Sequence, residues 1–257
     1  MSAPPPDVVV EPDAEQLARA VAEALVARLA AAQAVHGTAS VVLTGGGIGT
    51  AVLEAVAGLA AEPVRETVDW TAVHVWWGDE RFVPADDDER NEKAARRALL
   101  DAVGVPAGHV HAMPPSDGEF AVPEDAAAWY ADELAAAAPE GRSLPRLDVL
   151  LLGMGPEGHV ASIFPDSPAV RDERPVVAVR DCPKPPPTRV SLGFPAINAA
   201  EEVWLLVSGE AKAPAVAAAL RESTDPVQLP AAGVHGVRAT RWLLDRPAAG
   251  KLPAPPG

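Results

Sequence analysis

A histidine follows a glycine-rich loop in the segment LLLGMGPEGHVASIFPDSP, residues 150–168. The three glycines of this loop fit the spacing G-x-G-x-x-G of dinucleotide-binding loops. Such a loop needs a helix behind it, because the N-terminus of that helix meets the pyrophosphate. Pro165 and Pro168 leave room for at most two helical turns, and Pro156 removes a backbone N–H from the loop. We therefore interpret the match as accidental and turn to His159.

His159 has the chemistry of a general base. A neutral imidazole can take a proton from water near pH 7, and a nearby carboxylate can orient it or stabilise its charged form. Glu157 lies two residues before it. The alternative is a histidine that caps a short helix over residues 159–163, and the residues alone favour neither interpretation.

A second glycine-rich loop, TGGGIG, lies between a strand-like and a helix-like segment and includes Thr44, Gly45, Gly46 and Gly47. Glycines let backbone N–H groups approach an anion, and a helix N-terminus adds a favourable dipole. No Gly-Lys-Ser/Thr follows, so this is no Walker A loop. A tight turn needs fewer glycines, and we therefore favour phosphate or sugar-phosphate binding.

Charged residues occur at further strand ends. Asp79, Glu80 and Arg81 follow one strand, and an arginine can bind a carboxylate or phosphate through two hydrogen bonds. Lys212 lies in the first turn of an expected helix, where an anionic ligand would offset the unfavourable dipole. Arg189 can supply a second cation. Each of these charges, taken alone, also fits a solvated surface.

Strand-like and helical patterns alternate along the chain. A helix runs from an N-cap at Asp13 to Gly37, and another follows the TGGGIG loop through Val52, Leu53 and Val56. The expected helices after these cover 91–103, with Asn91 as N-cap, 124–138 and 210–221. The expected strands are 39–44, 72–77, 147–153, 176–180, 189–194, 203–209 and 241–245.

This alternation predicts a single α/β domain over residues 1–257, with a mostly parallel, Rossmann-like sheet and helices on both faces. We expect frayed tails at about 1–7 and 247–257. Ligands of such sheets bind beyond the carboxyl ends of the strands. That edge is where all the loops described above should meet.

The composition narrows the classes of partner. The net charge of −15 disfavours nucleic acid, although a small anionic substrate can still bind to local cations. No stretch has the length of a membrane span, and the N-terminus does not resemble a signal peptide. The single cysteine excludes an internal disulfide, and no metal-ligand spacing is present. We expect a cytoplasmic protein without metal, membrane or nucleic-acid partner.

Several motifs, in order along nearly the whole chain, resemble the 6-phosphogluconolactonase family, which is related to glucosamine-6-phosphate deaminases and isomerases. The continuation GHVASIFP is typical of the lactonases. Two positions differ from the usual pattern: Glu157 stands where the family has Asp, and TGGGIG replaces a loop similar to SGGST. The matching segments are TGGG (44–47), WWGDERFVP (76–84), ERN (89–91), LDVLLLGMGPEGHVASIFP (147–165), TRVSLGFPAIN (188–198) and GEAKAPAV (209–216).

The resemblance implies the deaminase/lactonase fold and hydrolysis of 6-phospho-D-glucono-1,5-lactone to 6-phospho-D-gluconate in the oxidative pentose phosphate pathway. It implies no cofactor, and we expect a monomer or a weak dimer. The residues it assigns to catalysis are His159 as general base, Glu157, Asp79 and Arg81. Those it assigns to the substrate and its phosphate are Thr44, Gly45, Gly46, Gly47, Asn91, Arg189 and Lys212.

Two other functions stay open. One is an isomerase or deaminase of an amino-sugar phosphate, against which the GHVASIFP continuation argues. The other is a non-enzymatic sugar-phosphate sensor, as related folds serve in regulators. A sensor of that kind should carry a DNA-binding segment, and the sequence contains none that we recognise.

Overall fold

The computed structural model describes residues 4–60, 68–221 and 223–253. Its central sheet has six strands in the order β1-β9-β8-β5-β2-β3, and every neighbouring pair is parallel. The predicted α/β architecture with a mostly parallel sheet is confirmed. The strands are β1 (Asp7–Glu11), β2 (Ala39–Leu43), β3 (Val73–Trp77), β5 (Val149–Gly153), β8 (Glu202–Val207) and β9 (Ala239–Asp245).

The strand order reverses between β2 and β5. From β2 the chain continues to β3 on one side, whereas from β5 it continues to β8 on the other. The loops that leave two such strands diverge to opposite faces of the sheet and open a crevice at their carboxyl ends. The TGGGIG loop leaves β2 and the GMGPEGH loop leaves β5, so the two glycine-rich loops border this crevice.

A second, antiparallel sheet of three strands was not predicted. It has the order β4-β7-β6 and comprises β4 (Asp79–Arg81), β6 (Val176–Val179) and β7 (Arg189–Leu192). The predicted strands 176–180 and 189–194 therefore exist but lie outside the central sheet. Only Gly78 separates β3 from β4, and both of its backbone groups bond to other strands. One residue thus carries the chain from the first sheet to the second.

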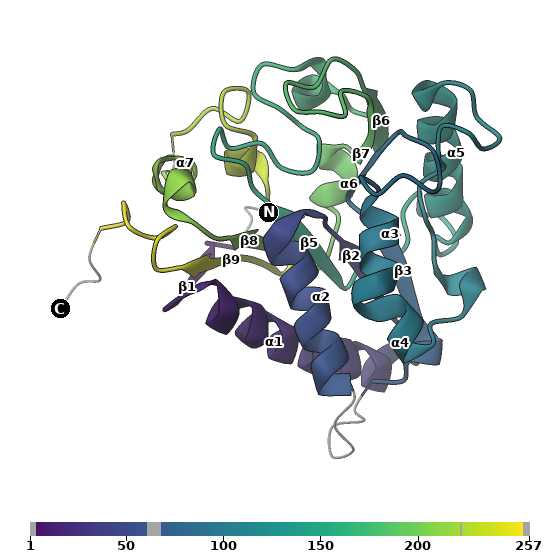
Figure 1. The fold of residues 1–257 in the computed structure, drawn as a ribbon, viewed down its shortest axis with the longest axis horizontal. Coiled ribbons are helices and arrows are strands. Elements are labelled where there is room, and N and C mark those ends of the chain that lie inside the picture. The colour runs from purple at the N-terminus through teal and green to yellow at the C-terminus, as the bar shows by residue number, and fades with distance from the viewer. Residues whose placement is uncertain (1–3, 61–67, 222, 254–257) are drawn as a thin grey trace.

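Helices cover both sheets (Figure 1). α1 (Ala14–His36) and α2 (Gly46–Ala60) pack against each other and against the central sheet, while α5 (Pro123–Ala136) packs against β6 and β7. Asp13 caps α1 and Gly37 ends it in the left-handed region, as the sequence predicts. The shorter helices are α6 (Phe194–Ile197) and α7 (Ala213–Ala219), the latter preceded by a 3₁₀ turn over Glu210–Lys212.

The predicted helix 91–103 is present but irregular. It consists of α3 (Asn91–Ala95), a π-helical turn over Arg96–Leu100, and α4 (Asp101–Val103). The prediction of Asn91 as N-cap is wrong. Arg90 holds the cap position without a side-chain hydrogen bond, and the Asn91 side chain donates instead to the carbonyl oxygen of Asp79 at 2.9 Å.

Three further features differ from what the sequence indicates. Residues 159–163 form no helix, because Val160 and Ile163 exchange backbone hydrogen bonds around a turn in which Ala161 has a φ of 49°. Strand β1 begins at Asp7, where the expected N-terminal tail ends, and it was not predicted. Within the expected C-terminal tail, Ala248 is buried and its N–H bonds to Asp245. Residues 1–3 and 254–257 lie outside the described part of the chain.

A buried carboxylate replaces the missing N-cap of α3. Glu80 is 1% exposed, and its side chain accepts hydrogen bonds of 2.8 Å from the N–H groups of Arg81, Asn91 and Glu92. The Arg90 guanidinium lies 3.8 Å away. Unbonded N–H groups at the start of a helix favour an anion. The Glu80 side chain therefore fixes α3 against β4.

We expect Glu80→Gln to lower the free energy of unfolding by about 2–4 kcal/mol. The amide nitrogen of glutamine cannot accept a hydrogen bond, so one N–H at the start of α3 loses its partner, and Arg90 loses a buried counter-charge. Denaturant unfolding monitored by circular dichroism measures the change.

Glu54→Gln is the matched control, because Glu54 is exposed on α2. It should change the same free energy by less than about 0.5 kcal/mol. Equal effects of the two substitutions would refute the structural role of Glu80.

Candidate active site

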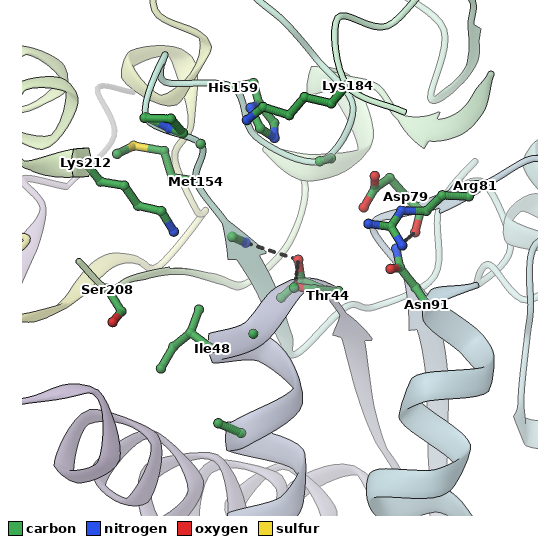
Figure 2. A pocket seen from close by; sticks show the side chains of 18 of the residues that line it. Thr44, Ile48, Asp79, Arg81, Asn91, Met154, His159, Lys184, Ser208 and Lys212 are labelled. Atoms are coloured by element: carbon green, nitrogen blue, oxygen red, sulfur yellow. Dashed lines mark hydrogen bonds between the residues drawn. The ribbon is translucent and has the colours of Figure 1, made fainter. Parts of the chain in front are cut away.

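A cleft of about 550 Å³ lies at the carboxyl ends of β2, β3, β5 and β8 (Figure 2). Its volume is within the range of small-molecule sites. Of the eleven residues that the sequence selects, only Glu157 does not line the cleft, and it contacts His159. The ten lining residues are Thr44, Gly45, Gly46, Gly47, Asp79, Arg81, Asn91, His159, Arg189 and Lys212.

The TGGGIG loop forms the floor of the cleft at the start of α2. The Thr44 hydroxyl accepts a hydrogen bond of 3.1 Å from the N–H of Gly153, which joins the ends of β2 and β5. A Cβ on Gly45 would collide with the Asn91 side chain, so this glycine allows α3 to approach the loop closely. At Gly46 the φ of 84° itself favours glycine. The local structure thus favours glycine at positions 45 and 46, in addition to the predicted role of these glycines in ligand binding.

Asp79 and Arg81 lie at one end of the cleft with Asn91 (Figure 2). Asp79 Oδ2 accepts a hydrogen bond of 2.6 Å from the hydroxyl of Ser162, and Arg189 Nη1 is 3.7 Å from the same oxygen. The guanidinium of Arg81 donates to the carbonyl oxygen of Glu89. Asp79 therefore connects β4 to the turn that follows His159.

The loop after β5 presents His159 to the cleft. Gly155 donates its N–H to the carbonyl oxygen of His159 at 3.1 Å, and the imidazole ring stacks on Phe164 with centroids 4.4 Å apart. Nδ1 of His159 lies 3.0 Å from Glu157 Oε1, but the ring is not aligned for a hydrogen bond. The longer acid at position 157 therefore reaches the histidine and acts on it mainly through its charge.

Burial lowers the pKa of His159, while the charge of Glu157 opposes this effect and that of Lys184 adds to it. The imidazole is therefore neutral at pH 7, which is the state that can accept a proton. The pKa of Lys212 is also lowered, first by burial and then by the charge of Lys184. A buried ammonium of this kind gains stability from a bound anion.

The sequence prediction missed two polar side chains that line the cleft, those of Lys184 and Ser208. Ser208 directly follows β8, and the strand-end rule that selects Lys212 also covers it; its hydroxyl donates to Asp245 at 2.5 Å. Lys184 lies in the Pro-rich loop 183–188, between the predicted strands 176–180 and 189–194. No signal in the sequence alone identifies its partner, Glu157.

Three other histidines form a separate cluster. The rings of His74 and His109 stack at 4.1 Å, and His74 Nδ1 is 3.0 Å from His111 Nε2. His111 also stacks on Trp76 at 3.8 Å. Burial, with the neighbouring histidine charges, lowers the pKa of His111 to about 4. Burial also lowers the pKa of His74, so the imidazoles of His74 and His111 are neutral at neutral pH.

In the described ranges of the chain, we find no group of three or more His, Cys, Asp or Glu side chains arranged to hold a metal ion. Over the same ranges, no helix is both long enough and apolar enough to cross a membrane.

Comparison with known proteins gives one consistent family. Residues 12–242 match the family of glucosamine-6-phosphate isomerases and 6-phosphogluconolactonases. The 6-phosphogluconolactonase of Mycobacterium tuberculosis is 53% identical over 249 residues, which cover 96% of this chain and 98% of that protein. The one from Streptomyces coelicolor is 52% identical, with 96% and 95% covered. The crystal structure of the Leishmania guyanensis lactonase superposes with a TM-score of 0.81 at 28% identity, with 97% and 99% covered.

Gly155 leaves the space that the His159–Glu157 contact occupies. A Cβ at this position would overlap Nδ1 of His159 and crowd the Glu157 carboxylate. We expect Gly155→Ala to fold and to displace the imidazole from Glu157, because side-chain ends move more easily than the backbone. A crystal structure of the variant measures the displacement.

Gly58→Ala is the control for the loss of a glycine. Gly58 is exposed in α2 and has open space at its Cβ, so alanine should leave the cleft unchanged and stabilise the helix by about 0.5–1 kcal/mol. If the Gly155→Ala variant keeps the imidazole in place, Gly155 does not determine the position of His159.

Proposed function

This chain belongs to the family of glucosamine-6-phosphate isomerases and 6-phosphogluconolactonases, and we propose that it hydrolyses 6-phospho-D-glucono-1,5-lactone to 6-phospho-D-gluconate with His159 as general base. This is the activity of a carboxylic ester hydrolase in the oxidative pentose phosphate pathway. One observation carries the mechanism: a neutral, partly buried imidazole faces a cleft and contacts a carboxylate through its other nitrogen.

The reaction needs one proton carrier. Because Nδ1 of His159 faces Glu157, Nε2 is the nitrogen free to accept a proton from water as the water oxygen attacks the lactone carbonyl carbon. The imidazolium then donates that proton to the ring oxygen as the ester C–O bond breaks. The new carboxylic acid loses its own proton to solvent, and His159 is neutral again. Glu157 stabilises the imidazolium between the two transfers.

The ammonium of Lys212 and the polar groups near it suit the phosphate. Lys212 and Ser208 lie across from the start of α2, where Gly46 and Gly47 offer backbone N–H groups (Figure 2). A phosphate bound there leaves the lactone ring to extend toward His159 and Asp79. Arg189 is engaged with carbonyl oxygens of loop 183–188, and only Nη1 faces Asp79. We therefore assign Arg189 mainly to supporting that loop.

Arg81, Asn91 and Asp79 complete the other end of the cleft. On the proposed function, Arg81 and Asn91 contact the hydroxyl groups of the ring, and Asp79 orients the turn after His159 through Ser162. The mechanism uses only side chains and water, and the expectations of no cofactor, a cytoplasmic location and a monomer or weak dimer stay predictions.

We expect His159→Ala to fold and to lower kcat/KM for the lactone by about 100-fold or more, since a general base contributes about 10²–10⁴-fold. The lactone is generated from glucose 6-phosphate by a dehydrogenase and followed as it disappears, with spontaneous hydrolysis subtracted. In the unmodified chain, activity should fall on the acidic side as His159 gains a proton. Because its pKa is lowered, that limb should lie below the ordinary histidine value of about 6.5.

His36→Ala is the matched control, because His36 is exposed at the end of α1. It should leave both the rate and the pH profile unchanged. Turnover by His159→Ala equal to that of the unmodified chain would remove His159 from the mechanism. Ammonia release from an amino-sugar phosphate, without lactone turnover, would identify a deaminase instead.

A further inference from the structure

Lys184 holds the carboxylate that faces the general base. Its Nζ lies 2.9 Å from Oε1 and 3.0 Å from Oε2 of Glu157, so the ammonium contacts both carboxylate oxygens. Oε1 is also the atom that lies 3.0 Å from His159 Nδ1. One carboxylate oxygen is therefore shared between the lysine and the imidazole.

The backbone of the loop that carries Lys184 is held in place by hydrogen bonds from residues of the same segment. Arg189 is buried, and its Nε and Nη2 donate to the carbonyl oxygens of Pro186, Lys184 and Pro185 at 2.8–3.2 Å. The N–H of Cys182 also bonds to the carbonyl oxygen of Pro187 at 2.9 Å. The backbone of Lys184 thus has a defined position, and only its side chain has to be ordered by Glu157.

The contact between Lys184 and Glu157 matters because the Glu157 side chain can adopt another conformation. Glu157 is half-exposed and one methylene longer than aspartate, so without a partner its carboxylate can turn away from the ring into solvent. Ordering a glutamate side chain costs conformational entropy that is comparable to the strength of one charged hydrogen bond. A cation that contacts both oxygens offsets that cost.

We propose that Lys184 is a positioning residue for His159 and that it acts through Glu157. The proposal rests on the proposed function of His159 but concerns a different residue and can be tested apart from turnover. Lys184 keeps the Glu157 carboxylate against Nδ1, and the carboxylate keeps Nε2 directed into the cleft.

The charged groups that face His159 determine whether its pKa rises or falls when Lys184 is replaced. Glu157 and Asp79 raise the pKa of the imidazole, and burial and Lys184 lower it. The pKa of Lys212, on the opposite wall of the cleft, is lowered by burial and by Lys184 and raised by Glu157. Loss of the Lys184 charge alone would raise the pKa of His159, but a Glu157 carboxylate that turns into solvent no longer raises it, and the influence of Glu157 is the larger of the two. The positioning role therefore predicts a lower pKa of His159 when Lys184 is replaced by a neutral residue.

The test compares Lys184→Met with Lys184→Arg, which keeps the positive charge. In Lys184→Met, we expect an NMR titration of the free protein to show the pKa of His159 lower by roughly 0.5 or more, because Glu157 leaves the ring. A higher pKa would mean that Glu157 stays in place without Lys184 and would overturn the positioning role. We also expect kcat to fall about tenfold or more, with the acidic limb of the pH profile moved to lower pH and KM changed less than about threefold. Lys184→Arg should restore most of kcat and the original limb.

A double-mutant cycle isolates the path through Glu157. In a Glu157→Gln background, Lys184→Met should change kcat less than about twofold, because the carboxylate that it positions is absent. Lys251→Met is the control for loss of a lysine, since Lys251 is exposed and does not line the cleft. It should leave kcat, KM and the titration unchanged.

The proposal and the proposed function fail in different ways. A Lys184→Met variant with KM raised about tenfold or more and an unchanged pH profile would make Lys184 a substrate ligand and overturn its positioning role. An unchanged titration together with unchanged kcat would overturn it as well. If His159→Ala keeps full turnover, the general-base mechanism fails, while the NMR titration of the free protein still decides whether Lys184 acts on the imidazole.

Discussion

The site depends on a buried carboxylate, that of Glu80, which does not itself line the cleft. Adjacent residues of a strand point to opposite faces, so in β4 the side chain of Glu80 turns toward α3, while Asp79 and Arg81 both face the cleft. Glu80 binds the first N–H groups of α3, and α3 brings Asn91 against Asp79. One interaction thus sets the distance between the strand and the helix that form this end of the site.

The rest of the cleft depends on close approach of backbone and side chain. At Gly45 the missing Cβ admits Asn91, and at Gly155 it admits the His159–Glu157 contact. Both glycines lie in loops that leave β2 and β5, the two strands between which the order reverses. The parallel sheet therefore places the loops together, and the glycines determine how near their neighbours come. A larger side chain at either position would widen the cleft locally and separate groups that must act on one ligand.

The sequence predicts the loops of the site because strand ends follow from local hydrophobic patterns, and the carboxyl ends of parallel strands share one edge. It does not predict contacts between distant segments. Asn91 fits an N-cap locally, but Glu80, eleven residues earlier, takes that role. Residues 159–163 look helical until Ser162 is tied to Asp79 and Ala161 takes a left-handed conformation. The contact between Lys184 and Glu157 cannot be predicted from local patterns either, because the two residues lie 27 positions apart in the sequence.

Charge has to be balanced within the cleft although the chain as a whole carries −15. A phosphate dianion next to the imidazole would raise the pKa of His159 and weaken it as a base at neutral pH. The burial of His159 and the positive charge of Lys184 act in the opposite direction. Lys212 lies across the cleft, where its lowered pKa makes an anion a favourable partner. On the proposed function, this separation lets the substrate bring two negative charges into the cleft while the imidazole stays neutral. The two lysines then have complementary tasks: Lys212 neutralises the ligand, and Lys184 keeps the carboxylate beside the base in place.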